Sequence, residues 1–421
     1  MSNLTTPLLG LVDVAVTGHI GAPVYIAAIA VGGAMFNMLY WLFNFLRMGS
    51  SGLTAQAWGA KDDLACRLVL YRALAIGAAI GTIMIVLGHP LCKVVLQFMD
   101  ADGDTAALAA RYFAICIWGA PAVMCTYALA GWMVGVQDSR AAMWMAIITN
   151  VVNVLVSLSL VFGLGMRIEG VATGTTVAQW TGFAAGAIIV WRKYRPSPPP
   201  LRLVFERGKL IAFFRINFFI FLRTCCLVAV TMWFTHAGAV QGNDILAANA
   251  ILLQLFMLFS FFIDGLAYAA EALAGKYVGA GDDKGLGALV RSLTVAGLVC
   301  ALVFAAAYFA AGEWFMGLLA KDQGVVATAA TYLPWAVAVP LCGFAAFVFD
   351  GIFVGLVRPG AMLASMVAAT ALFFATYYAI EPGAGNHGLW LAFNTYLLMR
   401  GFVEILMWLR LRKAKARAKN P

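Results

Sequence analysis

A chain of 421 residues with 63% hydrophobic and only 11% charged residues has too few polar groups to cover a water-facing surface, for which about 25% charged residues are usual. The mean hydropathy of +0.90 therefore excludes a soluble domain. The net charge of +9 does not indicate nucleic-acid binding, because the basic residues lie in short loops and a tail. Long apolar runs without alternating polarity predict helices and not a barrel, so we expect an all-α polytopic membrane protein.

A helix needs about 20 apolar residues to cross the hydrocarbon, and twelve stretches approach or exceed that length. In chain order they are Leu4–Gly18, Val24–Arg47, Leu68–Leu87, Ala106–Val136, Ala141–Leu164, Gly170–Trp191, Leu210–His236, Ile245–Gly275, Leu289–Ala311, Thr328–Leu356, Ala361–Ile380 and Leu389–Leu409. The first is short, since it would span roughly 22 Å of a core about 30 Å thick. We expect the start codon to lie inside the true first helix.

One stretch of the chain occurs twice. Ile26–Asp63 and Leu246–Asp283 align without a gap, so a single shift in residue number relates every position of the first copy to its equivalent in the second. Identical positions in the first copy include Ala27, Ala28, Ala30, Phe36, Leu53, Gly59, Ala60, Asp62 and Asp63. This repeat predicts two six-helix lobes. Six helices per lobe is an even number, so the repeat should be parallel, with its pseudo-two-fold axis along the membrane normal.

A break in composition separates the two lobes. After Arg192 the chain is basic and rich in proline, which predicts a stiff polar linker. We therefore expect an N-terminal lobe at 1–191, with a shortened first helix, a cytoplasmic linker at 192–209, a C-terminal lobe at 210–409 and a basic tail at 410–421. Lys and Arg gather in the linker, the tail and the loops after even-numbered stretches. This predicts cytoplasmic termini in the plasma (inner) membrane and a tail that touches anionic lipid.

Cysteines and short motifs give no sign of an enzyme. The eight cysteines lie mostly inside apolar stretches, and no Cys/His cluster has metal-ligand spacing. HExxH, GxSxG and phosphate-loop motifs are missing from the sequence, whereas Asp264-Gly265 and Asp350-Gly351 weakly resemble metal-binding motifs of membrane phosphotransferases. We expect no disulfide, no metal, no cofactor and no enzymatic activity.

A charge inside a span costs at least about 2.5 kcal/mol, so each one should face a cavity or a partner. Asp13 has no cation within one turn, which favours a carboxyl group that takes up and releases a proton. Asn153 and Ser157 share a face of the fifth span, and Thr175 lies on the sixth. Such residues also commonly bond one helix to another, and the sequence leaves both interpretations open.

The second half carries Asp264, Glu271 and Asp350, with Arg223 on the helix before them. These residues have two equally good interpretations. They could form a structural network of carboxylates and arginine, or they could form a site for ion coupling. The other charged residues in spans are assigned to structure: Arg47 and Arg400 lie near span ends and should snorkel to the interface, and Glu404 is one turn from Arg400 and should pair with it.

Methionine and aromatic side chains suit a pocket that repacks around varied flat molecules, although packing and lipid contact explain most of them. We assign to a substrate cavity Met35, Met38, Asn150, Gln179, Met257 and Phe261.

Four groups of motifs, in the right order along the chain, resemble the multidrug and toxic compound extrusion family, most nearly its DinF-like branch. They are Leu4–Asp13, then Leu46-Arg47-Met48 with Gly52–Gln56, then Asp264–Tyr268 with Glu271-Ala272, and finally Asp350–Gly355. The resemblance covers essentially the whole chain. It implies two lobes that alternate access to a central cavity and export cationic or aromatic compounds in exchange for protons or sodium ions.

The resemblance also implies roles for single residues. Asp13 matches the first-helix coupling carboxylate, Asn153 and Thr175 match its polar partners, and Asp350 matches a tenth-helix coupling carboxylate. Ser157 stands where a second carboxylate is often found, which favours a proton over sodium. We expect a monomer that contacts small cationic or aromatic substrates and the bilayer but no nucleic acid. The alternatives are a flippase for lipid-linked precursors from a related superfamily and an intramembrane phosphotransferase.

Overall fold

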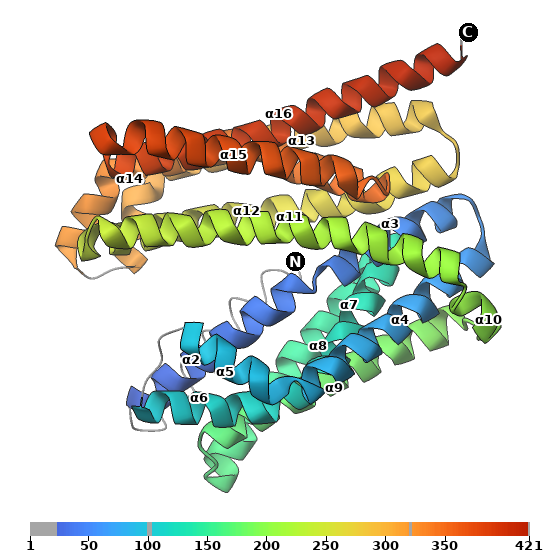
Figure 1. Cartoon of the computed structure of the whole chain (residues 1–421), viewed down its shortest axis with the longest axis horizontal. Helices are drawn as coiled ribbons and strands as arrows, with labels where there is room; N and C mark the ends of the chain where they lie inside the picture. The colour runs from blue at the N-terminus through green and yellow to red at the C-terminus, as the bar shows by residue number, and fades with distance from the viewer. Residues whose placement is uncertain (1–22, 99–102, 320–321, 420–421) are drawn as a thin grey trace. The chain divides into compact units, whose positions relative to one another are not determined.

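The computed structural model describes residues 23–98, 103–319 and 322–419. This part of the chain consists of helices joined by short turns and contains no β-strand (Figure 1). It divides into two compact units, the first ending at Phe214 and the second beginning at Arg215. The predicted all-α architecture is confirmed.

The first unit contains two core clusters of buried apolar side chains, one of them built around Met35, Phe36 and Phe113. Its helices are α2 (Pro23–Leu42), α3 (Phe45–Gly59), α4 (Asp63–Val86), α5 (Gly88–Phe98), α6 (Gly103–Cys116), α7 (Ala120–Gly135), α8 (Ser139–Leu158), α9 (Ile168–Tyr194), the short α10 (Leu201–Val204) and the first residues of α11 (Arg207–Val240). The described part of this unit also contains a 3-10 turn at Ile117–Gly119 and a π turn at Ser159–Gly163.

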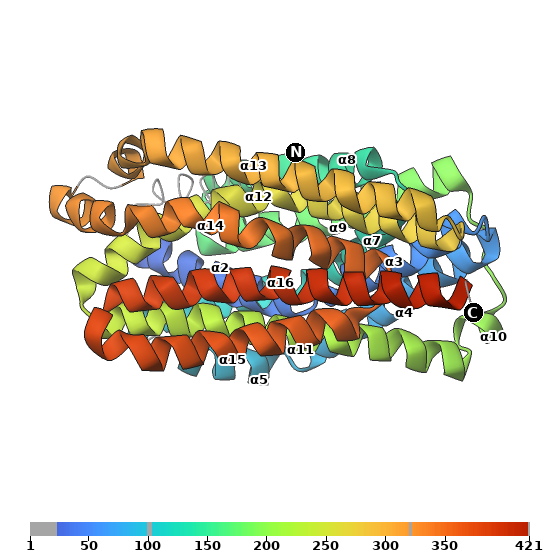
Figure 2. The same ribbon diagram turned by 90° about the horizontal axis from the view of Figure 1, so that it is seen from above.

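The second unit is built from fewer and longer helices. After the remainder of α11 they are α12 (Asn243–Gly279), α13 (Asp283–Leu319), α14 (Gln323–Gly355), α15 (Pro359–Ala384) and α16 (Asn386–Lys419). Large aromatic side chains such as Phe259, Phe353 and Trp390 are fully buried in it. Helices α15 and α16 pack side by side (Figure 2).

The repeat seen in the sequence recurs in the backbone of the two units. The shift in residue number that relates Ile26 to Leu246 also relates the helix boundaries, as Gly59 and Gly279, Asp63 and Asp283, Gly135 and Gly355, and Ser139 and Pro359. Left-handed backbone recurs at the same shift, at Lys61 and Gly281 (φ 57° and 68°), Gln137 and Val357 (65° and 53°), and Gly165 and Gly385 (65° and 53°). Each unit therefore forms these three turns at equivalent positions.

One close contact between helix backbones is repeated as well. A Cβ atom at Gly131 of α7 would lie 2.2 Å from the carbonyl oxygen of Arg47 on α3. A Cβ atom at Gly351 of α14 would lie 2.3 Å from the carbonyl oxygen of Ala267 on α12. Both glycines are needed because a side chain at either position would collide with the neighbouring backbone.

One difference between the units lies near Asn44. Helices α2 and α3 are separated at Phe43 and Asn44, where the Phe43 amide donates to the Tyr40 carbonyl at 3.0 Å and tightens the turn. The equivalent part of α12 is continuous. The predicted second span, Val24–Arg47, is therefore two helices, the second of which continues to Gly59.

Ten helical segments among the described residues are long and apolar enough to cross a membrane. Each overlaps one of ten predicted spans, although the ends mostly differ. The sixth predicted span corresponds to α9. This helix is not among the ten, because Thr, Gln and Gly residues lower its hydropathy. The first predicted span, Leu4–Gly18, lies outside the described residues. Apolar side chains cover the outside of α13, where Phe309 is 82% and Val303 60% exposed, as lipid-facing side chains would be.

Helix α4 binds the segment between α9 and α11. The buried Arg72 donates from Nε to the Val204 carbonyl at 2.9 Å and from Nη2 to the Leu203 carbonyl at 2.8 Å. The Tyr71 hydroxyl donates to the Pro196 carbonyl at 3.0 Å. The segment predicted to be a linker is thus attached to the first unit by hydrogen bonds to its backbone.

Candidate functional site

Polar residues of α8 and α9 meet inside the first unit. Nδ2 of the buried Asn153 donates to Oγ1 of Thr175 at 3.1 Å. Ser157 is buried one turn further along α8 and packs against Gly174, where a Cβ atom would lie 2.2 Å from the Ser157 hydroxyl. The structure thus places the predicted polar residues of the two helices together, whereas Asp13 lies outside the described residues.

This polar cluster has acceptors to spare. Oδ1 of Asn153 and the Ser157 hydroxyl have no hydrogen-bond partner among the described residues. Buried acceptors of this kind suit a protonated carboxyl group, which has a hydrogen to donate. The geometry fits the predicted role of these residues, which stays a prediction.

The residues predicted to line a substrate cavity differ in burial. Met35 is fully buried in the core of the first unit, whereas Met257 is 43% exposed on the second. Met38, Asn150, Gln179 and Phe261 are half-buried. Gln179 approaches the Tyr40 hydroxyl, with Cys116 and Tyr127 nearby, in a polar group inside the first unit that sequence reasoning did not find. The assignment of these residues to a cavity stays a prediction.

A network of charged residues lies inside the second unit. Asp350 of α14 accepts hydrogen bonds at Oδ2 from Arg223 of α11 and from Nη2 of Arg400 on α16, the latter at 2.6 Å. Asp350 is 6% and Arg400 2% exposed. The expected snorkelling of Arg400 is therefore wrong: its guanidinium is turned inward to the Asp350 carboxylate and lies over the Tyr396 ring at 5.5 Å.

Glu404 extends this network to α15. It is fully buried, and its Oε1 atom accepts a hydrogen bond from the Ser365 hydroxyl at 2.8 Å. Its carboxyl group also lies within hydrogen-bonding reach of Asp350. Oε2 of Glu404 and Oδ1 of Asp350 have no hydrogen-bond donor among the described residues, so one proton held between the two carboxyl groups would satisfy both atoms.

The two acids on α12 have different environments. Glu271 is 2% exposed and lies where Gly355 of α14 packs against the α12 backbone. Asp264 is half-buried. For both acids, a role in coupling stays a prediction.

A second buried polar network was not predicted from the sequence. Asn249 of α12 and Asn386 of α16 exchange hydrogen bonds at 2.8 and 3.0 Å, and the Trp390 indole donates to Asn249 at 2.8 Å. The spacing of Asn386, Trp390 and Asn394 at four-residue intervals on α16 was the available signal, since such residues share one helix face.

The start of α8 carries an ion pair. Asp138 caps the helix by accepting from the Ala141 amide, and its Oδ2 atom accepts from Lys193 at 2.6 Å and from the Tyr194 hydroxyl at 2.8 Å. Burial alone would raise the pKa of Asp138, but these hydrogen bonds outweigh it and hold the pKa below its ordinary value. Burial and the Asp138 carboxylate raise the pKa of Tyr194.

Comparison with known proteins decides the family. A family model described as MatE matches residues 1–159 and 217–378. The chain belongs to the MatE family. The DNA damage-inducible protein F of Escherichia coli (strain K12) is 35% identical to this MatE chain over 97% of it and 89% of that protein. The Multidrug export protein MepA of Staphylococcus aureus (strain N315) is 22% identical over 83% of this chain and 78% of that protein.

Solved structures show the same fold. A crystal structure described as MATE in the bent conformation superposes with a TM-score of 0.87 at 17% identity and covers 99% of this chain and 94% of that one. The resemblance inferred from the motifs is confirmed, and this protein is a multi-pass membrane protein of a transporter family that includes multidrug exporters. Its relatives are transporters and not enzymes.

Proposed function

We propose that this MatE protein exports cationic or aromatic compounds from the cytoplasm in exchange for protons, as a monomer in the inner membrane with both termini cytoplasmic. The observation that carries the proposal is the carboxyl pair of Asp350 and Glu404, buried beside Arg223 and Arg400. Two guanidinium groups already balance two carboxylates there. The pair can therefore gain a proton more readily than a sodium ion, which needs uncompensated oxygen ligands.

Asp13 is the first coupling residue in this proposal. Protonation from outside would make its carboxyl group neutral, so that it donates to the acceptors of Asn153 and Ser157 beside Thr175. The first helix would then repack, the cavity would shrink and the compound would leave. Release of the proton to the cytoplasm would reset the cycle. The cycle requires that the proton and the exported compound each bind the inward-open and the outward-open states with different affinity. Asp264, Glu271, Asp350 and Glu404 act as the second proton-carrying group.

Drug efflux from proteoliposomes tests the proposal. An imposed pH gradient should drive efflux, and a sodium gradient alone should not. Asp13→Asn should lower the rate at least about a hundredfold, comparable to the loss of a positioned proton-transfer group. Glu313→Gln, which changes an exposed acid of α13, is the matched control and should transport normally.

Three results would contradict the proposal. Equal efflux under a sodium gradient would assign coupling to sodium. Full activity of Asp13→Asn would remove Asp13 from the mechanism. Translocation of a lipid-linked precursor without drug efflux would favour the flippase, and metal-dependent turnover in detergent without transport would favour the phosphotransferase.

A further inference from the structure

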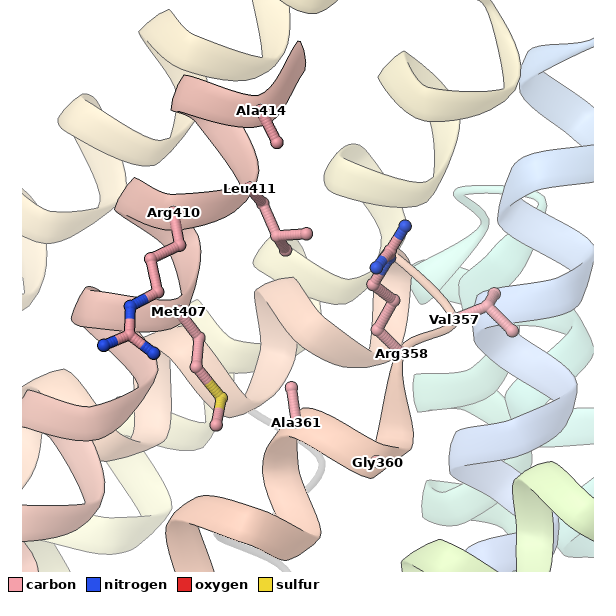
Figure 3. Close-up of a pocket in the computed structure, with 8 residues that line it drawn as sticks. All are labelled: Val357, Arg358, Gly360, Ala361, Met407, Arg410, Leu411 and Ala414. Carbon is pink, nitrogen blue, oxygen red and sulfur yellow. The ribbon is translucent and has the colours of Figure 1, made fainter.

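A groove lies between the start of α15 and the last turns of α16 (Figure 3). Its volume is about 770 Å³. Arg358 and Arg410 lie at its two sides, with the side chains of Ala361, Met407 and Leu411 between them and Ala414 at one end. Both arginines are exposed, and neither forms an ion pair with any described residue.

The equivalent place in the first unit is closed and contains its own anion. There Asp138 binds Lys193 and Tyr194, and the Tyr194 ring packs edge-on against Trp132 with ring centres 5.0 Å apart. Val190 is fully buried beside them. The carboxylate and the tyrosine ring together fill the space between α8 and α9.

Three replacements open this place in the second unit. At the equivalent positions of the second unit, Arg358 stands in place of Asp138, Ala414 in place of Tyr194 and Arg410 in place of Val190. Lys193 is matched by another lysine, Lys413. The matched turns at Gln137 and Val357 keep the backbone the same. The second unit thus lacks the carboxylate of Asp138 and the ring of Tyr194, and it has Arg410 as a third cationic side chain.

The surroundings define the class of ligand. The groove lies at the ends of two helices that are long enough to cross the membrane, so it sits at the level of lipid headgroups. The nearby Asp283 is already paired with Lys415 at 2.8 Å and does not supply an anion. We propose that the groove binds an anionic phospholipid, with the phosphate between Arg358 and Arg410 and an acyl chain along Met407 and Leu411.

Native mass spectrometry of the purified full chain tests this. The protein is incubated with equal amounts of phosphatidylglycerol and phosphatidylcholine, and the bound lipid is counted. Phosphatidylglycerol should be retained preferentially. Arg358→Asp with Ala414→Tyr, which rebuilds the first unit's Asp–Lys–Tyr arrangement with Lys413, should lower its apparent affinity at least about tenfold, because the first change reverses a charge at the phosphate and the second fills the groove with a ring. Arg410→Gln is a milder variant that opens no new packing and should lower it about fivefold.

Arg412→Ala and Arg417→Ala are the matched controls, since they remove the same charge from exposed positions of α16 outside the groove. They should keep the lipid. An equal loss of lipid affinity in the controls would show that the lipid is attracted to the basic tail as a whole, and it would overturn the proposed site. Equal retention of phosphatidylcholine, or normal lipid binding by both groove variants, would also overturn it. Displacement of the lipid by inorganic phosphate at equal concentration would identify a free-anion site instead and would also overturn the proposal.

Discussion

At the scale of single residues, the buried charges of the second unit depend on Asp350. Its carboxylate is the shared acceptor for Arg223 and Arg400. The sequence alone predicted each of these residues as functional or structural, because a charge inside an apolar span needs a partner. It did not predict which residues pair. Asp350 is separated from Arg223 and Arg400 by long stretches of chain, and only the packing of α11, α14 and α16 brings them together.

Asp350→Asn should therefore destabilise the protein strongly. The substitution removes the carboxylate that both buried arginines contact and leaves the Glu404 carboxyl group as their remaining acid partner, at a cost of about 3–5 kcal/mol. The melting temperature in detergent measures the loss, with Glu313→Gln as the exposed control. An unchanged melting temperature would show that water or another acid already balances both arginines.

Asp138 gives a prediction about pH. Its pKa is lower in the folded state than the ordinary value of about 3.9, so the stability it contributes is fully present above that value and is lost as the pH falls through the folded pKa. At pH 7, Asp138→Asn should cost about 1–2 kcal/mol through the lost charge-assisted hydrogen bonds from Lys193 and Tyr194, because Asn can still cap the helix. Melting curves of the two proteins should converge below about pH 4. A constant difference down to pH 3 would contradict this account.

At the scale of helices, chain order and approximate position could be predicted from apolar length, but the ends could not. Helix α13 extends beyond both ends of the predicted span Leu289–Ala311, and at its start Asp282 caps it by accepting from the Gly285 amide. The break between α2 and α3 was missed because Phe43 and Asn44 do not interrupt the apolar pattern. Caps and tight turns of this kind depend on one or two hydrogen bonds, which hydropathy does not detect.

Glycine substitutions separate close helix packing from backbone flexibility. Gly351→Ala should destabilise the protein by about 1–3 kcal/mol, since its Cβ atom would lie 2.3 Å from the Ala267 carbonyl oxygen. Gly287→Ala is the matched control on α13, where nothing lies within 4 Å of the added atom. It should be neutral or stabilise by up to about 1 kcal/mol. Similar melting temperatures for the two variants would show that α12 and α14 separate at little cost.

At the scale of the whole molecule, the sequence repeat predicted two equivalent units, and the matched helix ends bear this out within each unit. The orientation in the membrane stays a prediction from the distribution of Lys and Arg. Ser197→Cys in the linker should react with an impermeant thiol reagent only from the cytoplasmic side, and Gln323→Cys only from the outside. Both positions are exposed, and the native cysteines are replaced first. Labelling of both from one side would contradict the topology.

The unbroken register between the two halves has a consequence for engineering this protein. Adding one residue to a helix turns everything after it by about 100°, which would move buried side chains to the lipid-facing side. Among the three matched left-handed turns, the side chains of the two halves differ in charge and size, and glycine is replaced at one of them. The number of residues between these turns is nevertheless the same in both halves. Segments such as 60–66 and 280–286 should therefore be exchangeable as cassettes without adjusting their length, and each half offers a ready template for redesigning the other.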